Sequence, residues 1–380
     1  MMISRRNFLA VAGAAAAAAA LTACGGSSAS STSTASSAAA STASSAAEGG
    51  EKIVKVALTC DTGTIDDESF NQACWTAVSG YMGDDCQYYI PEADASDEDR
   101  ETMIRQAVND GADVIVCVGY LYGASLAWAA DQYPDVKFIA IDVTQGDIGT
   151  DAIPANCYCI TFKEEQAGYL AGYAIAKDGK TKLGFLGGMA VPAVIRYGYG
   201  FVQGADAAAK ELGVDDVNIK YWYSGGFAAT DEVKNKMDGW YSEGTEVVFA
   251  CGGPVCESCD AAAQANGGKM IGVDVDQSGR YDTVITSAMK GLAESVNEAL
   301  TDSMNNGWKF TETYAGKETK LGAAENCVGL PMETSKFNKF TQEQYDAMYA
   351  SIVDGTLTID DSFDTTVTPS VTNVTVDYQG

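Results

Sequence analysis

The stretch that decides the fold is Asp61-Thr-Gly-Thr-Ile-Asp-Asp-Glu-Ser-Phe-Asn-Gln72. The apolar run 53–60 before it predicts a buried strand, and the pattern of 70–82 predicts a helix. Open α/β sheets bind ligands where a strand leads through a polar, glycine-containing loop into a helix. The loop carries carboxylates, amides and one aromatic ring, so it can both hydrogen-bond and stack. An ordinary capped helix start is the alternative for the loop taken alone.

Strand-like runs alternate with helical patterns along the rest of the chain. Strands are expected at 53–60, 86–90, 114–119, 138–143, 157–162, 182–186, 218–223, 247–250, 270–275 and 283–287. Helices are expected at 70–82, 98–109, 126–132, 164–177, 202–211, 230–241, 254–266 and 290–303. Repeated β-α-β units imply parallel sheets with right-handed crossovers. The length suits two such sheets, so we expect an α/β fold of two doubly wound lobes with a cleft between them.

The first 23 residues have the anatomy of an export signal, with Arg5 and Arg6 before an alanine-rich stretch. That apolar stretch has about 16 residues, fewer than the ~20 needed to span a bilayer. Leu-Thr-Ala-Cys24 resembles the lipobox of bacterial lipoproteins, in which the cysteine is acylated and becomes the first residue. Residues 24–51, rich in Ser, Ala, Thr and Gly, predict a flexible tether. We therefore expect a lipid-anchored protein on the outer face of a cell membrane, with the Sec and twin-arginine routes both open.

Composition excludes several classes of function. The chain has 52 acidic and 24 basic residues and a net charge of −28, which argues against nucleic acid as a partner. It has no histidine, so the commonest general base and most zinc sites are missing. Cys251, Cys256 and Cys259 could supply three thiolate ligands, but no fourth is evident. We expect no metal and no cofactor, and we expect most cysteines to act as small hydrophobic residues.

Five segments, in this order, resemble the basic membrane protein (BMP) family of lipoproteins, which serve ABC importers. They are DTGTIDDESFNQACW (61–75), KFIAID (137–142), LGGM (186–189) with GYGFVQG (198–204), ACGG (250–253), and IGVDVDQ (271–277) with TSAMK (286–290). The resemblance spans about 52–355 and implies a type I periplasmic-binding-protein fold that closes on its ligand at a hinge. We expect one lobe at 52–160 and 280–312 and the other at 161–279 and 313–380.

The resemblance also implies a binding site, because the best-known members of the family bind purine nucleosides between two aromatic rings. The implied contacts are stacking by Phe70 and Phe227, base-edge bonds from Asn71 and Asp142, sugar contacts from Asp274, Lys290 and the Gly252 backbone, and a further contact from Asp61. A carboxylate can accept both donors of a vicinal diol, and Lys290 beside Asp274 would offset the buried negative charge. Glu68 and Pro254 depart from the family pattern, and Pro254 could reshape the sugar pocket.

The expected function is therefore that of a binding protein, not an enzyme, which delivers a nucleoside to the permease subunits of an ABC importer. A receptor of the same fold for a simple sugar or another small solute is the alternative. A nucleosidase that uses Asp61 with Asp274, or Asp66 with Asp67, as paired carboxylates is a further alternative. For the aromatic residues, the competing interpretation is a place in the core; for Asp274 and Lys290, it is an ordinary salt bridge.

Overall fold

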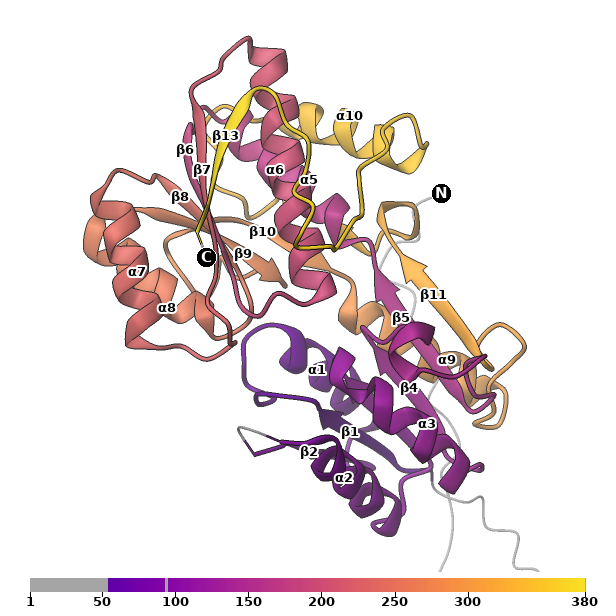
Figure 1. The fold of residues 1–380 in the computed structure, drawn as a ribbon. Coiled ribbons are helices and arrows are strands. Elements are labelled where there is room, and N and C mark those ends of the chain that lie inside the picture. Colours follow the sequence, from indigo (N-terminus) through magenta and orange to yellow (C-terminus); the bar gives the residue numbers. More distant parts are fainter. Residues whose placement is uncertain (1–53, 93–94, 380) are drawn as a thin grey trace, which may run out of the picture. The chain divides into compact units, whose positions relative to one another are not determined.

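Two sheets organise the chain in a computed structural model that describes residues 54–92 and 95–379 (Figure 1). The expected export signal (1–23), the tether (24–51) and Cys24 lie outside the described residues. The sheets are parallel, apart from one short edge pair, and carry helices on their faces, so the expected α/β fold of two doubly wound lobes is confirmed. We call the halves built on the two sheets the first and the second lobe.

The first lobe is built on a six-stranded sheet in the order β11-β5-β4-β3-β1-β2, in which all pairs are parallel. Its strands are β1 (Val56–Cys60), β2 (Cys86–Tyr89), β3 (Val114–Val118), β4 (Lys137–Ile141), β5 (Cys157–Phe162) and β11 (Lys317–Leu321). Helices α1 (Phe70–Met82) and α9 (Leu292–Asn305) pack on one face, and α2 (Asp97–Asn109) and α3 (Gly123–Gln132) pack on the other. Because both faces are covered, β1 and β3 are buried throughout and, apart from Thr59, apolar.

The second lobe is built on a seven-stranded sheet in the order β12-β10-β9-β8-β6-β7-β13, parallel except for the pair of β10 and β12. Its strands are β6 (Lys182–Gly187), β7 (Val217–Tyr223), β8 (Val247–Cys251), β9 (Lys269–Asp274), β10 (Val284–Lys290), β12 (Val328–Gly329) and β13 (Val374–Gln379). The remaining helices are α4 (Gln145–Ile148), α5 (Glu164–Lys177), α6 (Pro192–Leu212), α7 (Asp231–Ser242), α8 (Val255–Asn266) and α10 (Gln342–Val353), with short 3-10 turns at Tyr120–Tyr122 and Ala323–Glu325.

The main chain passes between the sheets three times, after β5, after β10 and after β11. The crossings lie side by side, because the Lys163 amide donates to the Leu321 carbonyl at 2.8 Å and the Gly291 amide donates to the Cys327 carbonyl at 2.6 Å. Short connections that lie next to each other can act as a hinge, because a few residues at the ends of elements can absorb the rotation of one lobe against the other.

Two strands lie in a different lobe from the one expected. Residues 280–312 were expected in the first lobe, yet β10 pairs with β9 in the second sheet. Residues 313–380 were expected in the second lobe, yet β11 pairs with β5 in the first. Helix α9 does pack on the first sheet, so the crossing follows β10 instead of preceding it. An apolar run marks a strand, but it does not say which of two sheets accepts it.

Helices α5 and α6 pack backbone to backbone through glycines. A β-carbon added at Gly168, Gly172, Gly200 or Gly204 would lie 2.0–2.1 Å from a carbonyl oxygen of the facing helix. Glycines within a sequence weaken the case for a helix, which is why α6 was expected only from 202 and in fact begins at Pro192. Proline fits the first turn, where its missing N–H has no partner to lose.

We expect Gly168→Ala to lower the free energy of unfolding by about 1–3 kcal/mol, because its methyl group would meet a backbone carbonyl that cannot move aside. Gly239→Ala in α7 is the matched control, since nothing lies within 4 Å of its β-carbon position. That change should stabilise the protein by up to about 1 kcal/mol. Urea denaturation compares the two variants; equal stability would show that α5 and α6 separate at no cost.

Candidate functional site

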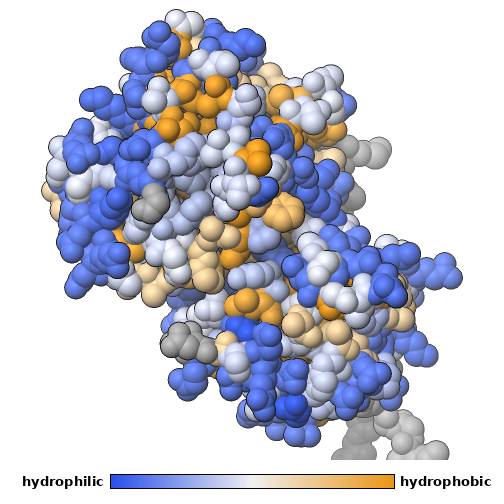
Figure 2. Space-filling view, in the orientation of Figure 1, coloured by the Kyte–Doolittle hydropathy of each residue, from blue (hydrophilic) through white to orange (hydrophobic). Residues whose placement is uncertain are grey.

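A cavity of about 950 Å³ lies where the carboxyl ends of strands from both sheets meet. Loops that follow β1, β3, β4, β6, β7 and β8, together with the last residues of β9 and β10, supply much of its wall. Figure 2 shows apolar side chains beside the hollow between the lobes, whereas the outer faces in this view are mostly hydrophilic. All eight residues expected to bind the ligand line this one cavity: Asp61, Phe70, Asn71, Asp142, Phe227, Gly252, Asp274 and Lys290.

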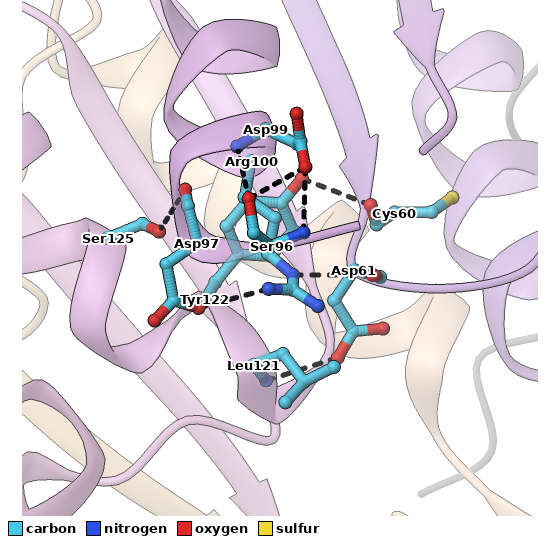
Figure 3. A network of polar contacts seen from close by, with 9 residues as sticks. All are labelled: Cys60, Asp61, Ser96, Asp97, Asp99, Arg100, Leu121, Tyr122 and Ser125. Atoms are coloured by element: carbon cyan, nitrogen blue, oxygen red, sulfur yellow. Dashed lines mark hydrogen bonds and ion pairs between the residues drawn. The ribbon is translucent and has the colours of Figure 1, made fainter. Parts of the chain in front are cut away.

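Asp61 follows β1 and is held in place from two sides (Figure 3). The Leu121 amide donates to its Oδ2 at 3.1 Å, and Arg100 Nε donates to its carbonyl oxygen at 3.3 Å. Gly119 is required beside it, because a β-carbon there would lie 2.0 Å from Asp61 Cγ and its φ is +113°. Burial raises the pKa of Asp61 to about 7, although the Leu121 amide opposes the shift. The cavity therefore holds a fixed carboxyl group that titrates near neutrality.

Asp67 explains why the paired aspartates precede α1. Its carboxylate accepts the amides of Ser69, Asn71 and Gln72 at 3.0, 2.9 and 3.0 Å, so it caps the helix and orients its first turn toward the cavity. Asn71 Nδ2 then donates to the Thr62 carbonyl at 2.9 Å. Asn71 Oδ1 is buried and has no hydrogen-bond partner among the described residues. The loop thus presents one free acceptor.

Lys290 is the centre of a buried group of charges at the boundary of the lobes. Its Nζ lies 2.6 Å from Asp142 Oδ2 and 3.0 Å from Glu164 Oε1, and Glu164 Oε2 accepts from Arg196 Nε at 2.7 Å. Burial alone would lower the pKa of Lys290, but the carboxylates of Asp142, Glu164 and Asp274 raise it above its ordinary value. Burial raises the pKa of Asp142 to about 6 even though Lys290 opposes the change. Asp142 Oδ1 is a second buried acceptor with no partner among the described residues.

The expected pairing of Lys290 with Asp274 is therefore wrong in one respect. Lys290 pairs directly with Asp142 and Glu164, whereas Asp274 accepts from Ser69 Oγ at 2.7 Å and from the Tyr197 hydroxyl at 3.3 Å. The reason is that Asp142, in the first lobe, reaches the end of β10 in the second lobe. Such a contact between lobes does not follow from which strands are neighbours within one sheet. Burial raises the pKa of Asp274.

The two expected stacking rings reach the cavity from different lobes. Phe70 opens α1 in the first lobe, and its ring centre lies 5.0 Å from Lys290 Nζ. Phe227 follows β7 in the second lobe. Its ring lies so close to the backbone of Gly188 and Gly252 that a β-carbon at those glycines would approach it to 2.4 and 3.1 Å. Gly252 is thus needed as a glycine for the position of the ring.

Residues that were not expected from the sequence also line the cavity or hold its charges, among them Tyr120, Glu164, Arg196 and Phe363. Tyr120 lies in the 3-10 turn after β3, and Glu164 begins α5 just after β5. Arg196 lies within α6 and Phe363 in an irregular segment, so neither of these two follows a strand end. The run Glu164-Glu165 directly after an expected strand was the one signal that could have indicated a site residue there.

Within 54–92 and 95–379, no group of three or more His, Cys, Asp or Glu residues is placed to hold a metal ion. Cys251, Cys256 and Cys259 are buried as free thiols, and Cys256 donates to the Ala250 carbonyl at 3.4 Å. Over the same residues, no helix combines the length and apolar character that a membrane span requires.

Comparisons with known proteins agree with this geometry. Basic membrane protein A1 of Borrelia garinii subsp. bavariensis is 30% identical over 299 residues, which cover 75% of this chain and 84% of that protein. The ABC transporter nucleoside-binding protein BmpA of Lactococcus lactis subsp. cremoris is 26% identical over 332 residues, which cover 80% of this chain and 89% of that protein.

Solved structures share the fold. An ABC transporter solute-binding protein from Aeropyrum pernix K1 superposes with a TM-score of 0.69 at 21% identity and covers 82% of this chain and 95% of its own. The family model described as "ABC transporter substrate-binding protein PnrA-like" matches residues 53–362. The match takes in both sheets except β13, and it includes all eight expected binding residues. The chain belongs to this family of ABC transporter substrate-binding proteins, as its sequence predicted.

Proposed function

We propose that this protein captures a purine nucleoside between its lobes and delivers it to the permease subunits of an ABC importer. The observation that carries the proposal is the combination of two aromatic rings with two free acceptors in one cavity. Phe70 and Phe227 come from different lobes, and Asn71 Oδ1 and Asp142 Oδ1 are buried without partners among the described residues. A flat heterocycle offers two faces for stacking and N–H donors at its edge, so it satisfies all four groups.

The charges of the cavity favour a nucleoside over its phosphate. The cations that line it in the described part of the chain, Arg100, Arg196 and Lys290, are each paired with a carboxylate. A phosphate group would have to compete for one of these pairs beside several buried carboxyl groups. A ribose instead presents neutral hydroxyls, which Asp274 can accept and Lys290 can donate to.

Binding without hydrolysis fits the same residues. The Asp67 carboxylate already accepts three backbone amides as the cap of α1. These hydrogen bonds occupy the oxygens that it would need as one of a catalytic pair. The name of the Lactococcus relative refers to nucleoside binding, which supports the proposed ligand class.

Calorimetry against adenosine, adenine and ribose tests the ligand. Phe227→Ala should weaken adenosine, guanosine and inosine alike by about 1–3 kcal/mol, the scale for truncating a base–aromatic stack. Asp274→Ala should cost more, because the Ser69 and Tyr197 hydroxyls and the ribose diol would all lose an acceptor. That variant should also lose the preference for adenosine over adenine. If ribose alone binds as tightly as adenosine, or Phe227→Ala leaves affinity unchanged, a sugar receptor becomes the better interpretation.

Ligand binding should close the lobes about the three crossings, because Phe70 and Phe227 belong to different lobes and a base stacked between them would hold the lobes together. Small-angle scattering should then give a smaller radius of gyration with saturating adenosine. The control is the Phe227→Ala variant at an adenosine concentration too low for that variant to bind. Its radius of gyration should stay at the larger value of the ligand-free protein. An unchanged radius in wild-type protein that calorimetry shows to be occupied would contradict hinge closure.

We also propose that the mature protein is acylated on Cys24 and reaches its permease on the tether 24–51. Cys24→Ser should abolish labelling by a palmitate analogue and release the protein from the membrane fraction. Cys86→Ser is the control, since Cys86 is a partly exposed thiol of the folded body and its loss should leave labelling intact. Label retained on the Cys24→Ser protein would refute the anchor.

A further inference from the structure

The segment between α10 and β13, residues 354–373, forms neither helix nor strand and is named the C-terminal strap. Its ends are anchored, because Leu357, Ile359 and Val371 pack against the core of the second lobe. Between the anchors, Phe363 and Val367 are 55% and 57% exposed. An irregular segment that is fixed at both ends yet exposes a large aromatic ring in the middle calls for a reason other than core packing.

Polar contacts hold the strap against both lobes. The Gln203 side chain in α6 donates to the Asp360 carbonyl at 2.9 Å and accepts from the Asp360 amide at 3.0 Å. Lys320 Nζ, on β11 of the first lobe, lies 2.7 Å from Asp361 Oδ2. Figure 1 shows the strap descending beside α6 toward the first lobe. The chain just before Phe363 is therefore tied to the two bodies that would move on closure.

Phe363 lines the same cavity as Phe70 and Phe227. Its ring centre lies 5.7 Å from the guanidinium carbon of Arg196, which pairs with Glu164. Glu164 pairs in turn with Lys290, so the ring lies over the charged end of the cavity. Phe227, by contrast, lies against the glycine backbone at 188 and 252. An aromatic ring at the mouth of a cavity offers a ligand an apolar surface that is not yet covered by protein.

We propose that Phe363 is a third aromatic ligand contact, delivered by the C-terminal strap, which covers the sugar end of a bound nucleoside. The inference rests on the proposed function for the nature of the ligand. Phe363 itself lies just beyond the match to the family model, which ends at residue 362. The ties to Gln203 and Lys320 would carry the ring with the lobes as they close, so that the strap acts as a cover over the ribose.

Calorimetry of four proteins tests the inference: wild type, Phe363→Ala, Phe363→Trp and Val367→Ala. Phe363→Ala should weaken adenosine about tenfold, on the order of the loss seen when a ring that stacks on a nucleoside is truncated. Phe363→Trp, which keeps an aromatic face, should stay within about threefold of wild type. Val367→Ala removes a side chain of similar exposure from the same strap, outside the cavity lining, and should bind like wild type. Adenine, which lacks the sugar, should lose less than about threefold in the Phe363→Ala protein.

Two outcomes would overturn the inference alone: equal adenosine affinity of Phe363→Ala and Val367→Ala, or a loss of adenine affinity as large as that of adenosine. Failure of the wild-type protein to bind adenosine, guanosine and inosine would instead overturn the proposed function, and this inference with it. Urea denaturation of each variant checks the fold, which the loss of a half-exposed ring should leave intact.

Discussion

A buried row of four charges, Asp142, Lys290, Glu164 and Arg196, holds the centre of this protein together. Asp142 belongs to the first lobe and Lys290 ends a strand of the second, while Glu164 begins the helix that follows the first crossing. The side chains of Lys290 and Glu164 are 1% and 0% exposed. Water therefore cannot replace the partner of either charged group. Removing one member would leave an uncompensated buried charge, the costly case for such groups.

The same row prepares the cavity for its ligand. Lys290 occupies only one oxygen of Asp142, and the other oxygen is left buried without a partner among the described residues. The two polar atoms of the Asn71 side chain are used in the same way. Its amide nitrogen donates to the Thr62 carbonyl, and its oxygen has no partner among the described residues. Contacts that position a side chain through one atom thus leave a second atom fixed in direction and ready for a donor. Fixing these groups in advance reduces the entropy that binding would otherwise lose.

Local pattern was enough to predict many elements. The expected ranges 70–82, 157–162 and 164–177 coincide with α1, β5 and α5, because apolar periodicity and the flanking polar residues mark both ends. The sequence pattern did not assign β10 and β11 to their sheets. That assignment depends on which existing strand has an edge free for pairing in three dimensions. It also gave no elements beyond 303, where β11 is largely polar and β12 has two residues.

The site divides along the same line. The loop 61–72 was found because the fold class fixes where ligands bind at strand ends. The family resemblance supplied the roles of the other site residues, including Phe227 and Lys290. Arg196 and Phe363 were missed because their positions depend on how α6 and the strap pack, which no local motif encodes. Glu164 was missed although it directly follows an expected strand.

The strap has one more consequence, for handling the protein at the bench. Its twenty residues include no lysine or arginine, so trypsin has no site there, whereas chymotrypsin can recognise the exposed ring of Phe363. A cut after Phe363 would leave β13 on a separate peptide, held by its six-residue pairing with β7 and by contacts such as those of the Thr372 and Asn373 amides with Asp206. Mild chymotryptic digestion is thus a local reporter of whether this ring is open to solvent or covered.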